Sequence, residues 1–176
     1  WGGGNLFVKN LSEYLVKNGH KVVFDLLHED IDIILLTDPR KSSYSSNFNH
    51  KDIINYLHYV NSNSLVLHRI NECDERKNTN GLNKFFVESN KCADRTVFVS
   101  QWLQGLYEKE GLYNNNLVIM SGSDSEIFNG KNKAAWENKT KLKFVTHHWG
   151  DNWNKGFDIY LELDNLLDQK KYSEKI

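Results

Sequence analysis

Apolar residues recur at two different spacings in the first part of the chain. One set recurs at helical spacing, so the pattern predicts an amphipathic helix from Asn5 to Lys17 that ends at Gly19. The residues of this set are Leu6, Val8, Leu11, Tyr14 and Leu15. Two runs come next, "KVVFDLL" at 21–27 and "DIDIILLTD" at 30–38. Both are rich in branched residues and almost continuously apolar, which is typical of buried parallel strands.

The rest of the chain keeps alternating between the two patterns. Further strands are predicted at 64–70, 95–100, 116–122 and 141–148, and further helices at 50–60, 82–93, 101–111 and 157–167. Ser100 is expected to cap the helix that follows it. This alternation predicts an α/β fold, a Rossmann-like parallel sheet with helices on both faces.

One polar segment, residues 129–141, interrupts the alternation and is the best candidate for a linker. We therefore expect a first domain over residues 1–128 and the first strand and helix of a second over 142–176. The chain opens on a glycine-rich stretch without Met and stops inside or just after a helix. We expect it to be a piece of a longer protein.

Composition and charge exclude several classes of function. Lys and Arg total 22, Asp and Glu total 23, and the net charge of −1 gives no electrostatic footprint for nucleic acid. No apolar run approaches the roughly 18 residues that a membrane span needs. Cys73 and Cys92 are isolated, as expected for reduced thiols in a cytoplasmic protein.

In an open α/β sheet, ligands bind beyond the carboxyl ends of the strands, so the loops there are the places to look for chemistry. The stretch "WGGGNLF" opens the first helix. Its glycines allow a ligand to approach the backbone, and free N–H groups at a helix start favour an anion. The spacing is not that of a dinucleotide fingerprint, and a tight structural turn explains the glycines equally well.

A second polar stretch, residues 68–77, follows the predicted strand at 64–70 and concentrates His, Arg, Asn, Asp and Glu. It is either a solvated charged loop or a polar pocket wall that faces a hydroxyl-rich substrate. Arg69 and Asn71 stand nearest the end of the strand, so we expect them to make the contacts.

The third stretch is "FVTHHWGDNWNKGFDIY", residues 144–160, and three kinds of site compete for it. Adjacent His147 and His148 on a strand point to opposite faces, so they are a poor metal pair and we expect no metal. Trp149 and Trp153 could stack on sugar rings. A phosphate cradle needs a polar turn, a cation and a helix start, which Lys155 and the next residue, a glycine, supply.

Four stretches then carry a family resemblance in the right order: "GGGNLFVKNLSEYLVKNGHKV", "DRTVFVSQWL", "VIMSGSDSEIF" and "LKFVTHHWGDNWNKGFDIY". Together they resemble glycosyltransferases of the GT-B fold, of the retaining family 4 type, over nearly the whole chain. The resemblance implies transfer of a sugar from a nucleotide-diphosphate sugar to a glycan or lipid-linked acceptor, without a cofactor. It also implies a cytoplasmic location, with peripheral contact at the inner face of the membrane left open.

The same resemblance implies roles for residues of the second predicted domain. Lys155 matches the lysine that binds the donor diphosphate, and Gly156 matches the glycine after it. The Arg that usually accompanies them is absent. His147 or His148 stands near that place, so a protonated His148 would supply the second cation.

Residues of the acceptor side follow from the first glycine loop and the polar stretch after it. Gly3, Gly4 and Asn5 match the loop that faces the reaction centre and the acceptor. Arg69, Asn71 and Trp149 are expected to line the same cleft. His68 is the nearest match to a family histidine near the acceptor, which makes it the candidate catalytic residue.

The chain departs from the family in ways that change the expectation. Ser121 stands where the family usually has Asn, and the paired glutamates of the donor site have no counterpart, so this chain alone is expected to be inactive. The alternative is a non-catalytic carbohydrate-binding α/β module that binds glycans through Trp149 and Trp153 without nucleotide. A different Rossmann-like enzyme, such as an epimerase, is disfavoured because no GxGxxG is present.

Overall fold

The computed structural model describes residues 3–40, 46–113, 115–135, 137, 145–146 and 153–168. The chain divides into two units, residues 1–122 and residues 123–176. The first unit holds all the described strands, and the second holds one described α-helix and a short 3₁₀ turn before it. The packing contacts described below therefore lie within one unit or the other.

Helices and strands alternate through the first unit. Its elements are α1 (Gly3–Lys17), β1 (Ile33–Leu36), α2 (His50–Tyr59), β2 (Leu65–Ile70), α3 (Asp74–Lys77), α4 (Leu82–Ser89), the 3₁₀ helix η1 (Asn90–Cys92), β3 (Arg95–Phe98), α5 (Gln101–Lys109) and β4 (Asn116–Val118). The second unit contains the 3₁₀ helix η2 (Trp153–Lys155) and α6 (Phe157–Asp168).

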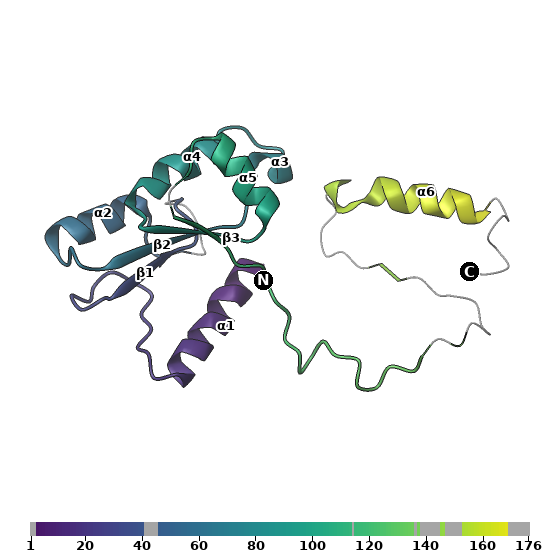
Figure 1. The fold of residues 1–176 in the computed structure, drawn as a ribbon, viewed down its shortest axis with the longest axis horizontal. Helices are drawn as coiled ribbons and strands as arrows, with labels where there is room; N and C mark the ends of the chain where they lie inside the picture. Colours follow the sequence, from purple (N-terminus) through teal and green to yellow (C-terminus); the bar gives the residue numbers. More distant parts are fainter. Residues whose placement is uncertain are drawn as a thin grey trace. The chain divides into compact units, whose positions relative to one another are not determined.

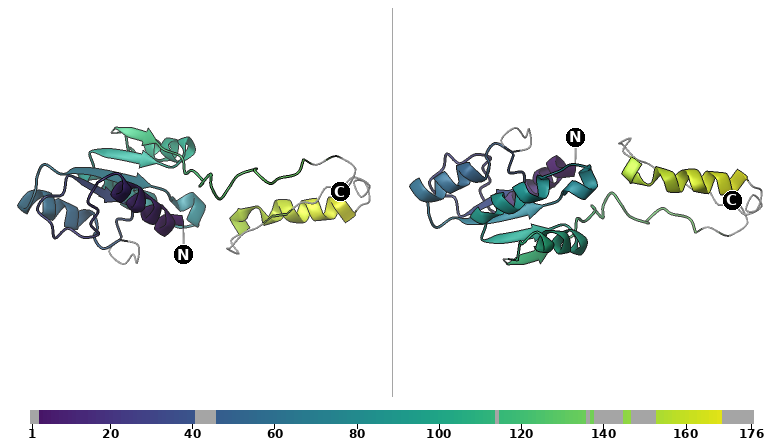
Figure 2. Two further views of the ribbon diagram at one scale, coloured as in Figure 1. Left: turned by 90° about the horizontal axis from the view of Figure 1, so that it is seen from below. Right: turned by 90° about the horizontal axis from the view of Figure 1, so that it is seen from above.

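The four strands form one parallel sheet in the order β1-β2-β3-β4. Because successive parallel strands are joined by right-handed connections, a sheet that grows in one direction places all its connecting helices on one face. Helices α2, α4 and α5 accordingly cover one face, and α1 lies across the other (Figures 1 and 2). The fold is therefore α/β with helices on both faces, compatible with a Rossmann-like arrangement, as the alternation predicts.

The core lies between the sheet and the three connecting helices. Ile34, Leu36, Ile53, Tyr56 and Val66 form one buried cluster, and Ile70, Cys73, Phe86, Phe98, Leu103, Tyr107 and Leu112 form another. Each large apolar side chain buried in this way contributes about 1.5–3 kcal/mol of transfer free energy. No residue of α1 is fully buried, so the opposite face of the sheet is covered less completely.

The predicted helix ends are confirmed in two places. Gly19 has φ +84°, and the amide of His20 donates to the carbonyl of Leu15 at 3.0 Å, which is the left-handed C-terminal motif that favours glycine. At the start of α5, the side-chain oxygen of Ser100 accepts from the amide of Leu103 at 3.2 Å.

The strand predicted at 21–27 is wrong, because this segment pairs with no strand in the described part of the chain. Side chains hold it in an irregular path instead. The amide of Leu27 donates to the Asp25 carboxylate at 3.0 Å, and Asn47 donates to the carbonyl of Phe24 at 2.9 Å. Such local bonds compete with a strand ladder. Apolar content alone does not reveal whether a run has a neighbouring strand.

Other elements differ from the prediction mainly in length. The strands are shorter than predicted, and the helix expected over 82–93 ends at Ser89 and continues as the 3₁₀ helix η1. Helix α3 was not expected, and its four residues lie in the stretch predicted to be a loop. Most of the strand predicted at 141–148 falls outside the described residues.

The start of α2 offers a test of local stability. Asn49 accepts from the amides of Lys51 and Asp52, at 2.8 and 3.3 Å, and the Asp52 carboxylate accepts from the Asn49 amide at 2.9 Å. Replacing Asn49 with Ala removes this reciprocal capping box and is expected to cost about 1 kcal/mol in urea denaturation. Asn55→Ala, on the exposed surface of the same helix, is the matched control. Equal unfolding midpoints for the two variants would contradict the assignment.

Candidate functional site

The candidate site lies where the strands of the sheet end, which we call the carboxyl edge. The N-terminal end of α1 lies at this edge, on the same side of the sheet as the end of β2 that leads into α3 (Figure 1). A direct contact fixes the arrangement, because the guanidinium carbon of Arg69, near the end of β2, lies 3.9 Å from the ring centre of Phe7 in α1. The carboxyl edge therefore brings Arg69 to the glycine-rich start of α1.

Arg69 is almost completely enclosed at this position, with 9% of its surface exposed. On the sheet it pairs with Val97, and Leu67 precedes it on the same face, so its sheet neighbours there are apolar. No carboxylate of the described residues lies within ion-pair distance of its guanidinium. Burial lowers the pKa of Arg69 from its ordinary value, and the side chain remains a cation at neutral pH.

Arg40 lies at the same edge and, in contrast to Arg69, forms ion pairs with carboxylates. Its guanidinium donates to both oxygens of Asp38, at 2.8 and 2.7 Å, and also to Glu72. Lys77 lies 3.4 Å from the second oxygen of Glu72. The hydrogen bond to Asp38 is the main cause that raises the pKa of Arg40. This network connects the loop after β1 to the loop after β2, whereas no described carboxylate pairs with Arg69.

Sequence analysis did not single out this network. The signal available was "DPR" at residues 38–40, directly after a strand, together with the acidic residue at the end of the next strand. The ends of neighbouring parallel strands lie at the same edge of the sheet, so an arginine that follows one strand can reach a carboxylate that follows the next. The sequence alone does not say which arginine is paired.

His68 lies on the opposite face of β2 from Arg69, among the connecting helices. It has no exposed surface, and its ring packs edge-on against Phe86 with ring centres 5.9 Å apart. Its Nδ1 lies 3.0 Å from the amide nitrogen of Asn90, which also bonds Thr96, and its Nε2 has no hydrogen-bond partner. The structure thus places His68 in the core, and a catalytic role for it stays a prediction.

The burial of His68 has an electrostatic consequence. Desolvation, together with the nearby His50, lowers the pKa of its imidazole to about 3, while Asp38 acts in the opposite direction. The ring is therefore neutral at physiological pH. A neutral, enclosed imidazole contributes packing and one hydrogen bond to the core.

The glycines at the start of α1 have no packing reason to be glycine. Gly3 and Gly4 are exposed, neither has a positive φ, and a Cβ added at either would meet nothing within 4 Å. Glycine costs up to about 1 kcal/mol relative to Ala inside a helix. Gly3, Gly4 and Asn5 are all exposed, so a ligand can approach the backbone of this first helical turn.

Asn71 is the remaining predicted acceptor contact that the structure describes. It follows β2 directly and is partly buried, and its carbonyl accepts from the guanidinium of Arg76 at 3.1 Å. Asn71 thus lies at the carboxyl edge, two residues after Arg69.

The predicted donor residues belong to the second unit. Lys155 is exposed in η2, and Gly156 has φ +85°, a conformation that strongly favours glycine. The carbonyl of Gly156 accepts from the amide of Tyr160 at 3.1 Å, so α6 begins directly after Gly156. Trp153 is 61% exposed and lies beside Phe157. His147, His148 and Trp149 lie outside the described residues.

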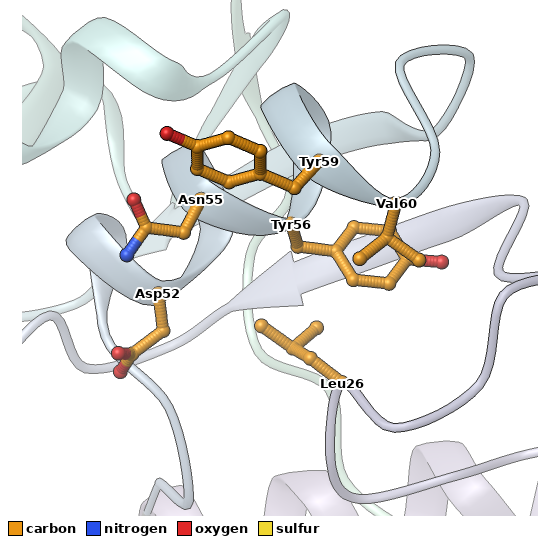
Figure 3. Close-up of a pocket in the computed structure, with 6 residues that line it drawn as sticks. All are labelled: Leu26, Asp52, Asn55, Tyr56, Tyr59 and Val60. Carbon is orange, nitrogen blue, oxygen red and sulfur yellow. The ribbon is translucent and has the colours of Figure 1, made fainter.

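The described residues of the first unit also line surface pockets, and two of these are alternative locations for a site. One, of about 280 Å³, lies between α2 and the irregular segment at Leu26 and is lined by Leu26, Asp52, Asn55, Tyr56, Tyr59 and Val60 (Figure 3). Asp52 is already engaged in capping α2, and the pocket gathers no cation. The second, of about 420 Å³, lies between α3 and α5 and includes Glu75 and exposed Trp102. We assign the candidate site to Arg69 and α1, because only there is a buried charge left without a counter-ion among the described residues.

The described residues contain no cluster of three or more side chains able to hold a metal ion. None of the helices they form is long and apolar enough to cross a membrane.

Comparison with known proteins adds no family assignment. No protein-family model, curated protein or solved structure shows a significant match to this chain.

Proposed function

We propose that this chain is part of a glycosyltransferase that moves a sugar from a nucleotide-diphosphate sugar to a glycan or lipid-linked acceptor. The proposal rests on Arg69, which pairs with no carboxylate of the described residues and lies beside the glycine-rich start of α1. This is the edge where parallel α/β sheets bind ligands. The ordered motifs that resemble the GT-B family support the same activity.

The acceptor side of the proposed reaction is the carboxyl edge. The start of α1 offers exposed backbone at Gly3 and Gly4 and the side-chain amide of Asn5. The end of β2 adds Arg69 and Asn71. Hydroxyl-rich substrates are held by groups of this kind, which fix orientation through hydrogen bonds. Holding the acceptor hydroxyl against the sugar of the donor lowers the entropic part of the barrier to transfer.

The donor side of the proposed reaction is the turn before α6. When the sugar is transferred, a bond forms between its anomeric carbon and the acceptor oxygen while the bond to the diphosphate breaks. Negative charge develops on the departing diphosphate, and the proton of the acceptor hydroxyl passes to a diphosphate oxygen. Lys155 and the positive end of the α6 helix dipole supply positive charge of the kind that stabilises such a leaving group. Gly156 allows the chain to turn sharply between the cation and the helix.

Replacing Lys155 with Ala tests the donor half. We expect the variant to bind UDP and GDP at least about tenfold more weakly, because a charge-assisted hydrogen bond to a phosphate contributes about 1.5–3 kcal/mol. Ligand-observed NMR with the whole chain measures the affinity. Lys133→Ala removes another exposed lysine of the same unit and is the control.

The outcomes of this titration separate the two candidate functions. Loss of nucleotide binding in the Lys155 variant alone supports the transferase. Absence of nucleotide binding by the natural chain, or equal binding by both variants, contradicts it. The exposed Trp153 favours the carbohydrate-binding module as the second candidate, which predicts binding of glycans with no dependence on nucleotide.

A further inference from the structure

The guanidinium of Arg69 is a charge that the described fold does not neutralise. It is nine-tenths buried and has apolar neighbours on the sheet, whereas Arg40 at the same edge is bonded to two carboxylates. Enclosing most of a charged side chain without a counter-ion is destabilising. A largely buried cation without a counter-ion at the carboxyl ends of parallel strands therefore points to an anionic ligand there.

The contact with Phe7 determines which part of the guanidinium remains free. The aromatic ring, centred 3.9 Å from the guanidinium carbon, covers one face of the planar group. The N–H groups point outward in the plane of the guanidinium, so stacking on the face leaves them able to bind. This in-plane fork matches the two oxygens of a carboxylate or phosphoryl group.

The start of α1 adds further donors near the same position. Phe7 is four residues from Gly3, where this 15-residue helix begins, a rise of about 6 Å along the axis. The first amides of a helix have no partner within it and carry partial positive charge. No acidic side chain occupies the first turn of α1 to neutralise them, and Gly3 and Gly4 leave the backbone unobstructed.

We propose that Arg69 and the first turn of α1 bind an oxyanion, a phosphoryl or carboxylate group carried by the sugar acceptor. This inference rests on the proposed function for the word acceptor, while the oxyanion site itself rests on the buried arginine and the open helix start. The acceptor class is therefore an anionic glycan or a phosphate-bearing lipid or sugar, in place of a neutral glycan.

The test is a titration of the whole ¹⁵N-labelled chain with inorganic phosphate and, separately, with acetate. We expect saturable shifts of the amides of Gly4, Asn5 and Leu6. Arg69→Met keeps an apolar stem and removes the charge, so its affinity should fall at least tenfold while its thermal midpoint does not fall. Arg95→Met is the matched control, because Arg95 lies on the same sheet face, is exposed, and should not affect binding.

A second variant protects the test against a folding defect. Arg69→Lys keeps the charge and loses the planar fork, so binding should weaken by severalfold and the fold should persist. Saturation by phosphate alone identifies a phosphoryl group, and saturation by acetate alone identifies a carboxylate. The proposal is overturned if neither anion gives saturable shifts, or if Arg69→Met binds as well as the natural chain.

The result is independent of the nucleotide titration. A chain that binds nucleotide through Lys155 but no anion at Arg69 refutes the oxyanion site and leaves the transferase proposal standing. A chain that binds the anion but no nucleotide refutes the transferase proposal and leaves the oxyanion site.

Discussion

Acidification from pH 7 to pH 4.5 is expected to lower the free energy of unfolding by about 2–3 kcal/mol through His68 alone. Burial holds the pKa of this imidazole near 3 in the folded chain, against about 6.5 in the unfolded chain. Between these values the unfolded chain binds a proton that the folded chain does not. The stabilising effect is therefore complete above about pH 6.5 and is lost progressively as the pH falls towards 3.

Replacing His68 with Gln removes this titration and retains an acceptor for the amide of Asn90. We expect the variant to be less stable at pH 7, because the core is repacked, but its stability should fall less steeply below pH 6.5. The difference in slope should approach about 1.4 kcal/mol per pH unit, since one proton is no longer taken up. Urea denaturation at pH values from 7.5 to 4.5 measures it.

The control for this experiment is His58→Gln, because His58 is exposed on α2 and its replacement disturbs no core contact. Carboxylates that titrate in the same range are present in every variant, so their contribution cancels in the comparison. Parallel stability curves for the natural chain and the His68 variant would show that the imidazole is not held neutral by burial.

The pattern of apolar residues in the sequence predicts most of the helices and strands of the first unit. Branched apolar runs and helical spacing predict the four strands and their connecting helices, because both patterns are typical of a parallel sheet packed against helices. The segment 21–27 has the same composition, but side-chain hydrogen bonds to its backbone take the place of a strand partner. Helix α3 was missed because four residues are too few to show a period.

The sequence predicts where the candidate residues lie in the fold, but it does not predict their partners. The strand predicted at 64–70 places Arg69 and Asn71 near its carboxyl end, where the structure also has them, and their role in binding stays a prediction. The sequence does not distinguish Arg69 from Arg40, because pairing with Asp38 and Glu72 depends on loops brought together by the fold. The alternation of side chains along β2 sends adjacent residues to opposite faces, which is why His68 is enclosed in the core while Arg69 reaches α1.

Phe86→Ala is expected to have the largest effect on stability, a loss of about 3–5 kcal/mol. The Phe86 ring is 2% exposed and lies at the centre of an aromatic cluster, with ring centres 5.9 Å from His68, 6.3 Å from Phe85 and 6.4 Å from Tyr107. Truncation leaves a cavity that these rigid rings cannot fill. Phe85→Ala is the matched control and should cost less, because Phe85 is only partly buried.

The same variant connects packing to the acid sensitivity of the fold. The ring of Phe86 is part of what keeps water from His68, so a cavity beside the imidazole reduces its desolvation and raises its pKa towards the ordinary value. Phe86→Leu, which loses less volume and should stay folded, is therefore expected to show a shallower loss of stability between pH 6.5 and 4.5 than the natural chain. If its pH dependence is unchanged while its stability at pH 7 falls, the enclosure of His68 comes from η1 and Thr96 instead of from the aromatic cluster.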